Sequence, residues 1–202
     1  MADLALMQEL LDTAMEAARA AGAQIRQNYD RPGQVREKGG RRNLVTDTDE
    51  AAQVAALEVI SRRHPAHFIL AEEDPAGRPD KHGVWTIPGG AVWAVDPLDG
   101  TTNFTTSIPV FCSAVGLALD GVPVAGAIYD PMRDEMLAGA RGLGATVNGE
   151  PLPPLEPVPL RYATVGLDWS RGKLSRAEFA ALLDQISRAS RTLRVLGSAA
   201  LA

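Results

Sequence analysis

The sequence predicts an α+β fold in which a pair of helices precedes an antiparallel sheet, followed by an incomplete α/β part. Apolar residues recur every three or four positions over residues 4–29 and again over 54–60, which is the spacing of amphipathic helices. Between residues 68 and 149, short apolar segments alternate with Gly, Pro and Asn, which is typical of strands joined by tight turns. A strand-helix-strand pattern follows the proline-rich segment 151–159.

Length and charge bound the class of protein. The 202 residues, 46% of them hydrophobic, can bury one core, or one domain and part of another. The net charge of -5 predicts no nucleic-acid partner, because clustered Lys and Arg hold phosphate backbones. The N-terminus does not resemble a secretory signal, and no stretch is apolar for long enough to cross a bilayer. We therefore expect a cytoplasmic protein without a membrane partner, and a buried, inert thiol at Cys112.

Two helices are expected in the first third of the chain. Asp3 is a suitable N-cap for the first, and the polar segment 30–33 stops it. The second follows a short β-branched segment at 43–46, with Asp47 or Thr48 as its cap and the His-Pro pair at 64–65 as its end. The apolar stripes comprise Met7, Leu11, Ala14, Ala18, Ala21, Ile25 and Tyr29 in the first helix and Val54, Leu57 and Ile60 in the second.

The sheet is expected to be an antiparallel meander. Pairs at 120–121, 130–131 and 148–149 carry the residue types of tight turns. The predicted strands are 68–71, 91–95, 111–119, 124–129 and 135–140.

A domain boundary is expected in the stiff proline-rich segment, which gives an N-terminal part at 1–152 and a partial C-terminal α/β domain at 153–202. The latter should hold strands at 163–165 and 193–196 around a helix at 175–189. Ser175 and Glu178 have capping-box spacing, and the expected buried face is Phe179, Leu182, Leu183 and Ile186. Residues 197–202 resemble a cap and the opening of a further helix, so the sequence looks truncated.

An acidic turn after an apolar strand holds the residues that are best suited to bind a metal ion. Asp96 stands at the strand end, Pro97 fixes the turn, and Asp99 returns at a spacing that can direct both carboxylates into one space. Two carboxylates and a backbone carbonyl suit Mg²⁺, which prefers oxygen ligands. Gly100 and the amides after it would form an anion nest if a helical turn begins there. Taken alone, these residues are more typical of a plain reverse turn.

A longer set of motifs resembles the inositol monophosphatase family. The run 96–104, Asp-Pro-Leu-Asp-Gly-Thr-Thr-Asn-Phe, is similar to the central signature of that family. Lys38 with the segment 43–49 is similar to its mobile-loop lysine and the motif that follows. The segment 71–73 is similar to its glutamate motif, although Ala71 stands where Gly is usual. Further matches lie at 126–131, 142–145, 148–149 and 197–200, so the resemblance spans nearly the whole chain.

The resemblance implies a layered αβαβα sandwich and Mg²⁺-dependent, Li⁺-sensitive hydrolysis of a small phosphate monoester, with two or three bound ions. It implies that Glu72, Asp96 and the carbonyl of Leu98 bind one Mg²⁺, while Asp96 and Asp99 share a second. Thr101, hydrogen-bonded to Asp49, would position the attacking water, and Glu72 would complete the catalytic set. The implied substrate-binding residues are Leu98, Asp99, Gly100, Thr101, Gly197, Ser198 and Ala199.

Simpler interpretations stand beside these roles. The segment 72–74 is otherwise a solvated acidic loop, and Lys38 belongs equally well to a solvated basic loop. Asp49 is otherwise a first-turn residue favoured by the helix dipole. Trp93 is expected in the core. The histidines, which lack metal-binding spacing and are expected at the surface, are His64, His67 and His82.

Two hypotheses from different classes follow. The first is an active phosphatase and a homodimer, acting on a substrate similar to myo-inositol 1-phosphate. Fructose 1,6-bisphosphate, histidinol phosphate and 3'-phosphoadenosine 5'-phosphate are alternatives within the same family. The second is a catalytically impaired remnant that binds metal or phosphate, because the family's later Trp-Asp motif, whose aspartate completes the second metal site, does not occur in the sequence.

Overall fold

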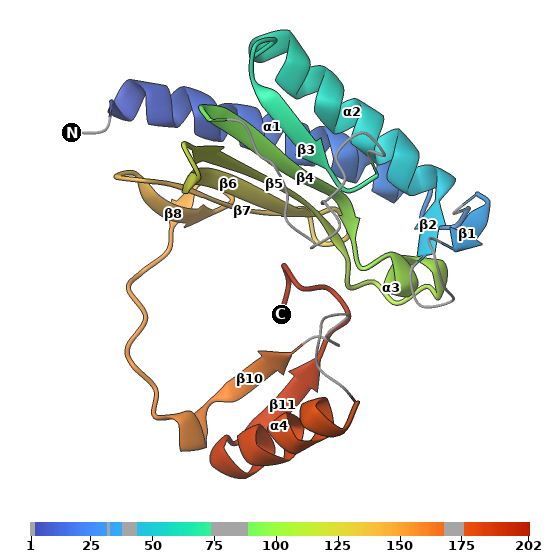
Figure 1. The fold of residues 1–202 in the computed structure, drawn as a ribbon, viewed down its shortest axis with the longest axis vertical. Helices are drawn as coiled ribbons and strands as arrows, with labels where there is room; N and C mark the ends of the chain where they lie inside the picture. Colours follow the sequence, from blue (N-terminus) through green and yellow to red (C-terminus); the bar gives the residue numbers. More distant parts are fainter. Residues whose placement is uncertain (1–2, 32, 38–43, 74–88, 168–175) are drawn as a thin grey trace.

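The computed structural model describes residues 3–31, 33–37, 44–73, 89–167 and 176–202. Its helices are α1 (Leu4–Gln27), α2 (Asp47–Arg63), α3 (Thr101–Thr105), the 3-10 turn η1 (Leu160–Tyr162) and α4 (Arg176–Ala189). Its strands are β1 (Val35–Glu37), β2 (Leu44–Thr46), β3 (Phe68–Ala71), β4 (Ala91–Asp99), β5 (Cys112–Leu119), β6 (Val122–Asp130), β7 (Glu135–Ala140), β8 (Gly144–Val147), β9 (Glu150–Pro151), β10 (Thr164–Leu167) and β11 (Thr192–Val195). The expected α+β architecture is confirmed, with α1 and α2 on one face of the main sheet (Figure 1).

Helix α1 begins as expected and ends two residues early. The Asp3 carboxylate accepts hydrogen bonds from the amides of Ala5 and Leu6. At the other end, the Asn28 side chain donates to the carbonyl of Gln24 at 2.8 Å. The Asn28 side chain therefore competes with backbone amides for a carbonyl of the helix, and the helix ends there. Tyr29 lies beyond the end of the helix, and its ring packs against Phe104 and Phe111.

Helix α2 is capped by Thr46, so the expectation of Asp47 or Thr48 as the cap was wrong by one or two positions. The Thr46 hydroxyl accepts from the amides of Thr48 and Asp49, and the Asp49 carboxylate accepts from the Thr46 amide at 2.7 Å. This reciprocal arrangement is a capping box, and here aspartate takes the position that Glu or Gln usually fills. It fixes Asp49, which is 1% exposed, at the start of the helix.

The main sheet has the order β3-β4-β5-β6-β7-β8-β9 and is not wholly antiparallel. Strands β4 to β9 form the expected meander, and the turns at 120–121 and 148–149 have the paired positive φ angles of tight hairpins. Strands β3 and β4, however, are parallel. The antiparallel expectation was wrong there because a connection of 19 residues, 72–90, is long enough to return the chain for a parallel pair.

The core lies between the two helices and one face of this sheet. Trp93 and Phe111 are fully buried in it, and Cys112 is a buried free thiol, as expected. Close packing of α1 on the sheet depends on Gly22, since a Cβ there would lie 2.3 Å from the Tyr129 ring. In the described part of the chain, no helix combines the length and the apolar character needed to span a bilayer.

The C-terminal strands β10 and β11 pair in parallel, and helix α4 joins the same unit (Figure 1). The expected buried face of α4 is only partly buried: Phe179, Leu183 and Ile186 are half-buried and Leu182 is 40% exposed. A two-stranded sheet offers little surface to cover a helix, which accounts for the difference. Ser175, the expected cap, lies outside the described residues. The division at 152 and 153 stays a prediction.

Two of the three histidines are wholly or partly buried, contrary to expectation. His64 is buried, and its Nε2 lies 3.0 Å from the Thr13 hydroxyl. The rings of His64 and His67 stack with centroids 4.6 Å apart, and Trp93 donates from Nε1 to His67 Nδ1 at 3.1 Å. The surface prediction failed because His64 caps the end of α2, which packs against α1 and β4. His82 lies outside the described residues.

Acid should weaken the packing around His67. Burial and the neighbouring His64 lower the pKa of His67, so between the two pKa values the unfolded chain binds more protons than the folded protein. Stability should therefore fall as the pH drops below about 6.5, the ordinary histidine value. Between pH 7.5 and pH 5.5, we expect the free energy of unfolding to fall by about 1 kcal/mol more in the wild type than in His67→Gln. This difference is the net contribution of one hydrogen bond. Urea unfolding at the two pH values measures it. Equal losses in both proteins would contradict this assignment.

Candidate active site

The candidate site is built at the end of β4, where the ladder is interrupted. Asp96 pairs with Ala114 of β5 and Asp99 with Cys112, so one extra residue is accommodated on β4. Such a bulge bends a strand and redirects its side chains. Pro97 lies inside it, at a position where a residue without an N–H is tolerated. Asp96, Leu98 and Asp99 therefore leave the strand in different directions.

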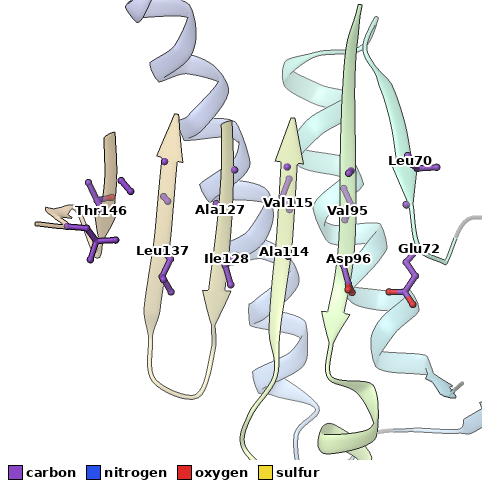
Figure 2. Close-up of a pocket in the computed structure, with 18 residues that line it drawn as sticks. Leu70, Glu72, Val95, Asp96, Ala114, Val115, Ala127, Ile128, Leu137 and Thr146 are labelled. Carbon is purple, nitrogen blue, oxygen red and sulfur yellow. The ribbon is translucent and has the colours of Figure 1, made fainter. Parts of the chain in front are cut away.

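The parallel register of β3 and β4 brings Glu72 to Asp96. Ala71 pairs with Val95, and the Glu72 amide donates to the Val95 carbonyl at 3.0 Å, so the next residues along both strands are neighbours. Figure 2 shows the two carboxylates directed toward each other at the strand ends. The structure thus brings together two residues that the family resemblance assigned to one metal ion.

The pair carries an electrostatic cost. Burial, then the negative charge of Glu72 and its hydrogen bond, and then the charge of Asp99 raise the pKa of Asp96 well above its usual range. Two adjacent carboxylates cannot both stay ionised without a proton or a cation between them. The atoms available to bind a cation are all oxygens, which suits a hard divalent cation such as Mg²⁺. The residues present therefore fit the group that the sequence implied.

A second pair joins Thr101, at the start of α3, to Asp49, in the first turn of α2. The Thr101 hydroxyl is 3.0 Å from Asp49 Oδ1 and 3.1 Å from the carbonyl oxygen of Leu98. The expected hydrogen bond between Thr101 and Asp49 is thus present. The capping box of α2 holds Asp49 through its other oxygen, Oδ2, which fixes the direction of Oδ1.

Helix α3 starts directly after the bulge, so the helical turn on which the anion-nest interpretation depends is present. Gly100 occupies its N-cap position with φ of +101°, and no side chain from the described residues caps the first amides. A Cβ on Gly100 would lie 3.0 Å from the Val110 carbonyl oxygen and 3.1 Å from Phe111 Cβ. Only glycine meets both the backbone angle and the close approach. The first turn of α3 therefore follows directly on the strand end that carries Asp96 and Asp99.

Asp99 is held by the segment 197–200 rather than directed at Glu72. Its Oδ2 accepts from the Ser198 hydroxyl and the Ala200 amide, both at 2.7 Å, and its Oδ1 accepts from the Ala199 amide at 3.2 Å. Sequence comparison suggested Ser198 and Ala199 as substrate contacts, whereas in the structure both donate to Asp99. Among the described residues, no three His, Cys, Asp or Glu side chains converge closely enough to hold a metal ion together. The first implied ion would use Glu72 and Asp96, and the second would use Asp96 and Asp99.

Asn103 was not assigned a role from the sequence, although it helps to hold the site. Its Nδ2 donates to the carbonyls of Val110 and Leu196, both at 2.7 Å. Gly197 follows with φ of +75°, and a Cβ there would lie 2.9 Å from the Asn103 amide. No local signal predicts this contact, because one acceptor lies 93 residues away. Lys38, the implied mobile-loop residue, lies outside the described residues.

An apolar groove of about 840 Å³ runs along the sheet face opposite α1 and α2. Figure 2 shows Glu72 and Asp96 at one end of it, with Ile128 and Leu137 farther along. The carboxylate pair therefore lies at the edge of an open, largely uncharged surface.

The fold and the site define an α+β protein with an acidic strand-end site next to a helix N-terminus. Residues 6–202 match the inositol monophosphatase family, and the chain belongs to that family. It is 42% identical over 146 residues to the inositol-1-monophosphatase of Synechocystis, which covers 72% of this chain and 48% of that protein. It is 34% identical to inositol monophosphatase 3 of Solanum lycopersicum, over 100% of this chain and 74% of that protein.

A solved structure supports the same assignment. The inositol monophosphatase from Anabaena superposes with a TM-score of 0.78 at 35% identity, covering 96% of this chain and 69% of that one. The matched region spans about half the length of the Synechocystis relative and about three quarters of the tomato relative.

Proposed function

We propose that this chain hydrolyses a phosphate monoester of inositol or a related sugar to the alcohol and inorganic phosphate, and that the reaction depends on Mg²⁺. The observation that carries the proposal is the contact between Glu72 and Asp96, which needs a cation to stay charged. The names of the Synechocystis and tomato relatives support inositol 1-phosphate as the first substrate to test.

The proposed ligands are oxygen atoms at the end of β4 and its neighbour. Glu72, Asp96 and the Leu98 carbonyl would hold one Mg²⁺, and Asp96 and Asp99 would hold a second. When bound, such ions supply positive charge that lowers the pKa of water and offsets charge on the leaving oxygen. The Thr101 hydroxyl lies 3.1 Å from the Leu98 carbonyl oxygen, but when its single proton is donated to Asp49 the lone pairs of that carbonyl are available to a cation.

Thr101 and Asp49 are the proposed proton-handling pair. When the Thr101 hydroxyl donates its proton to Asp49, its lone pairs become free to accept a hydrogen bond from a water molecule. That bond would orient the oxygen of the water toward the phosphorus of the substrate. The burial of Asp49 supports this role, because a fixed carboxylate keeps the hydroxyl in one orientation.

The phosphate would be bound by backbone amides. Those of Gly100 and Thr101, at the uncapped start of α3, are proposed to donate to its oxygens. Gly197 to Ala199 would border the alcohol portion, with Ser198 acting through Asp99 as described above. A third, weaker ion on Glu72, inhibition by Li⁺, a homodimer and a cytoplasmic location stay predictions from the family resemblance.

The direct test is release of phosphate from myo-inositol 1-phosphate with and without Mg²⁺, with Glu72→Gln as the matched control. We expect turnover only with Mg²⁺, reduced at least about 100-fold in the variant, as is usual when a charge-stabilising group is lost. Fructose 1,6-bisphosphate and 3'-phosphoadenosine 5'-phosphate are the comparison substrates. Turnover of one of these alone would reassign the substrate.

The competing function is a remnant that binds metal or phosphate without turnover. The three hydrogen bonds that Asp99 accepts from segment 197–200 favour it, since they occupy a carboxylate that the second ion needs. Binding of Mg²⁺ without turnover of any of the three substrates would establish the remnant and reject the phosphatase.

A further inference from the structure

The contacts of Asp99 leave its two oxygens unequal. Each carboxylate oxygen has two lone pairs in the plane of the group. At Oδ2 the Ser198 hydroxyl and the Ala200 amide, both at 2.7 Å, fill them, and the Cys112 thiol approaches the same oxygen at 3.8 Å. At Oδ1 the described residues supply a single donor, the Ala199 amide at 3.2 Å. Within the described part of the chain one lone pair therefore stays open, and it belongs to Oδ1.

The groups around Ser198 are built to keep this arrangement. Ser198 is fully buried, and its hydroxyl contacts only Asp99 and the Cys112 thiol within the described residues. The Asn103 side chain holds Leu196, so the position of Ser198 is set from α3 as well.

We propose that Ser198 is a positioning residue that occupies Oδ2 of Asp99 and so restricts a bound cation to Oδ1. The proposal rests on the proposed function, since it assumes that Asp99 ligates a divalent ion. Its consequence is selectivity between cations. Mg²⁺ demands near-octahedral geometry, which suits one oxygen per carboxylate, whereas the larger Ca²⁺ also accepts carboxylates through both oxygens. Blocking Oδ2 therefore favours Mg²⁺ over Ca²⁺.

Substituting Ser198 with alanine frees a lone pair on Oδ2 and loosens the carboxylate. Outer-shell partners of metal ligands usually change metal affinity by about 10-fold to 100-fold when removed. We expect Ser198→Ala to weaken Mg²⁺ binding by at least about 10-fold on this basis, and to change Ca²⁺ binding much less. The ratio of the two affinities is the informative quantity, because general loosening of the fold would weaken both ions together.

Isothermal titration calorimetry of the 202-residue chain with MgCl₂ and CaCl₂ tests the proposal. Ser113→Ala is the matched control, since Ser113 is also fully buried and donates its hydroxyl, in this case to the Ala18 carbonyl. Ser198→Thr keeps the hydroxyl and should restore most of the Mg²⁺ preference. If Ser198→Ala does not fold, Ser198→Cys, with similar volume and a weak donor, replaces it and should show the same loss of preference.

The outcomes separate the two proposals. Tight Mg²⁺ binding by the wild type and a lowered Mg²⁺ to Ca²⁺ preference in the Ser198 variant, but not in the Ser113 variant, support the positioning role. An unchanged preference in the Ser198 variant overturns that role and leaves the proposed function standing. Absence of Mg²⁺ binding by the wild type overturns both.

Discussion

Replacing Asp96 with asparagine is expected to abolish Mg²⁺-dependent phosphate release and, at the same time, to stabilise the metal-free protein. The amide keeps the shape of the side chain, and its oxygen can still accept from the Leu98 amide. The substitution removes the negative charge that both ions would share. A metal contribution of several kcal/mol to the barrier corresponds to a loss of about 1,000-fold or more in the rate of phosphate release. The substitution also removes the repulsion from Glu72, so the free energy of unfolding without metal should rise.

The pH dependence gives the sign of this stability change. Because the pKa of Asp96 is raised in the folded protein, the folded state binds more protons than the unfolded chain once the pH exceeds the ordinary carboxyl range. The metal-free wild type should therefore lose stability as the pH rises from about 4, the ordinary Asp value, toward neutrality. The asparagine variant should show a flatter profile and a gain of at least about 1.4 kcal/mol at pH 7, the value of one pKa unit.

Asp130 provides the opposite case within the same chain. It is fully buried, but it accepts from two backbone amides and pairs with Arg133 at 2.8 Å. Asp130→Asn should therefore destabilise the protein and leave the Mg²⁺ response intact. Urea unfolding of both variants, with and without MgCl₂, measures the contrast. Loss of stability in both, with the Mg²⁺ response retained in both, would mean that Asp96 is an ordinary structural carboxylate.

Thr101→Val should lower kcat by about 100-fold to 10,000-fold, the usual contribution of a group that handles protons, with little change in KM. Valine preserves the branched shape and removes the hydroxyl that bridges Asp49 and the Leu98 carbonyl. The Mg²⁺ affinity should hold within a few-fold, since Thr101 is not a proposed ligand.

Thr101→Ser is the matched control for this prediction. Serine retains the hydroxyl and should keep most of the activity in the same phosphate-release assay. A valine variant that turns over at the wild-type rate would remove Thr101 from the reaction. A variant whose KM rises while kcat stays constant would make the hydroxyl a binding group instead.

Local sequence patterns predicted those parts of the fold and site that depend on neighbours in the chain. Asp3 as a cap and the hairpin at Asn148 both rest on residues within a few positions. The contact of Thr101 with Asp49 spans 52 residues and was predicted only through the resemblance to a known family.

Other features depend on register and on distant chain segments. The pairing of Glu72 with Asp96 follows from a parallel register between β3 and β4, which alternation of apolar residues does not reveal. The hydrogen bond from Ser198 to Asp99 joins residues 99 positions apart and turned a suggested substrate contact into a positioning contact. His64 was misplaced because its burial is decided by α1 and Trp93 and not by its own neighbours in sequence.

The central claim is that Glu72 and Asp96 share a divalent cation. Crystals grown with MnCl₂, an ion with oxygen preferences similar to those of Mg²⁺ and a strong anomalous signal, test it most directly. The account predicts an anomalous peak within ligand distance of a carboxylate oxygen from each of the two residues. The account is contradicted if, at saturating MnCl₂, the two side chains stay hydrogen-bonded to each other and no anomalous peak lies beside them.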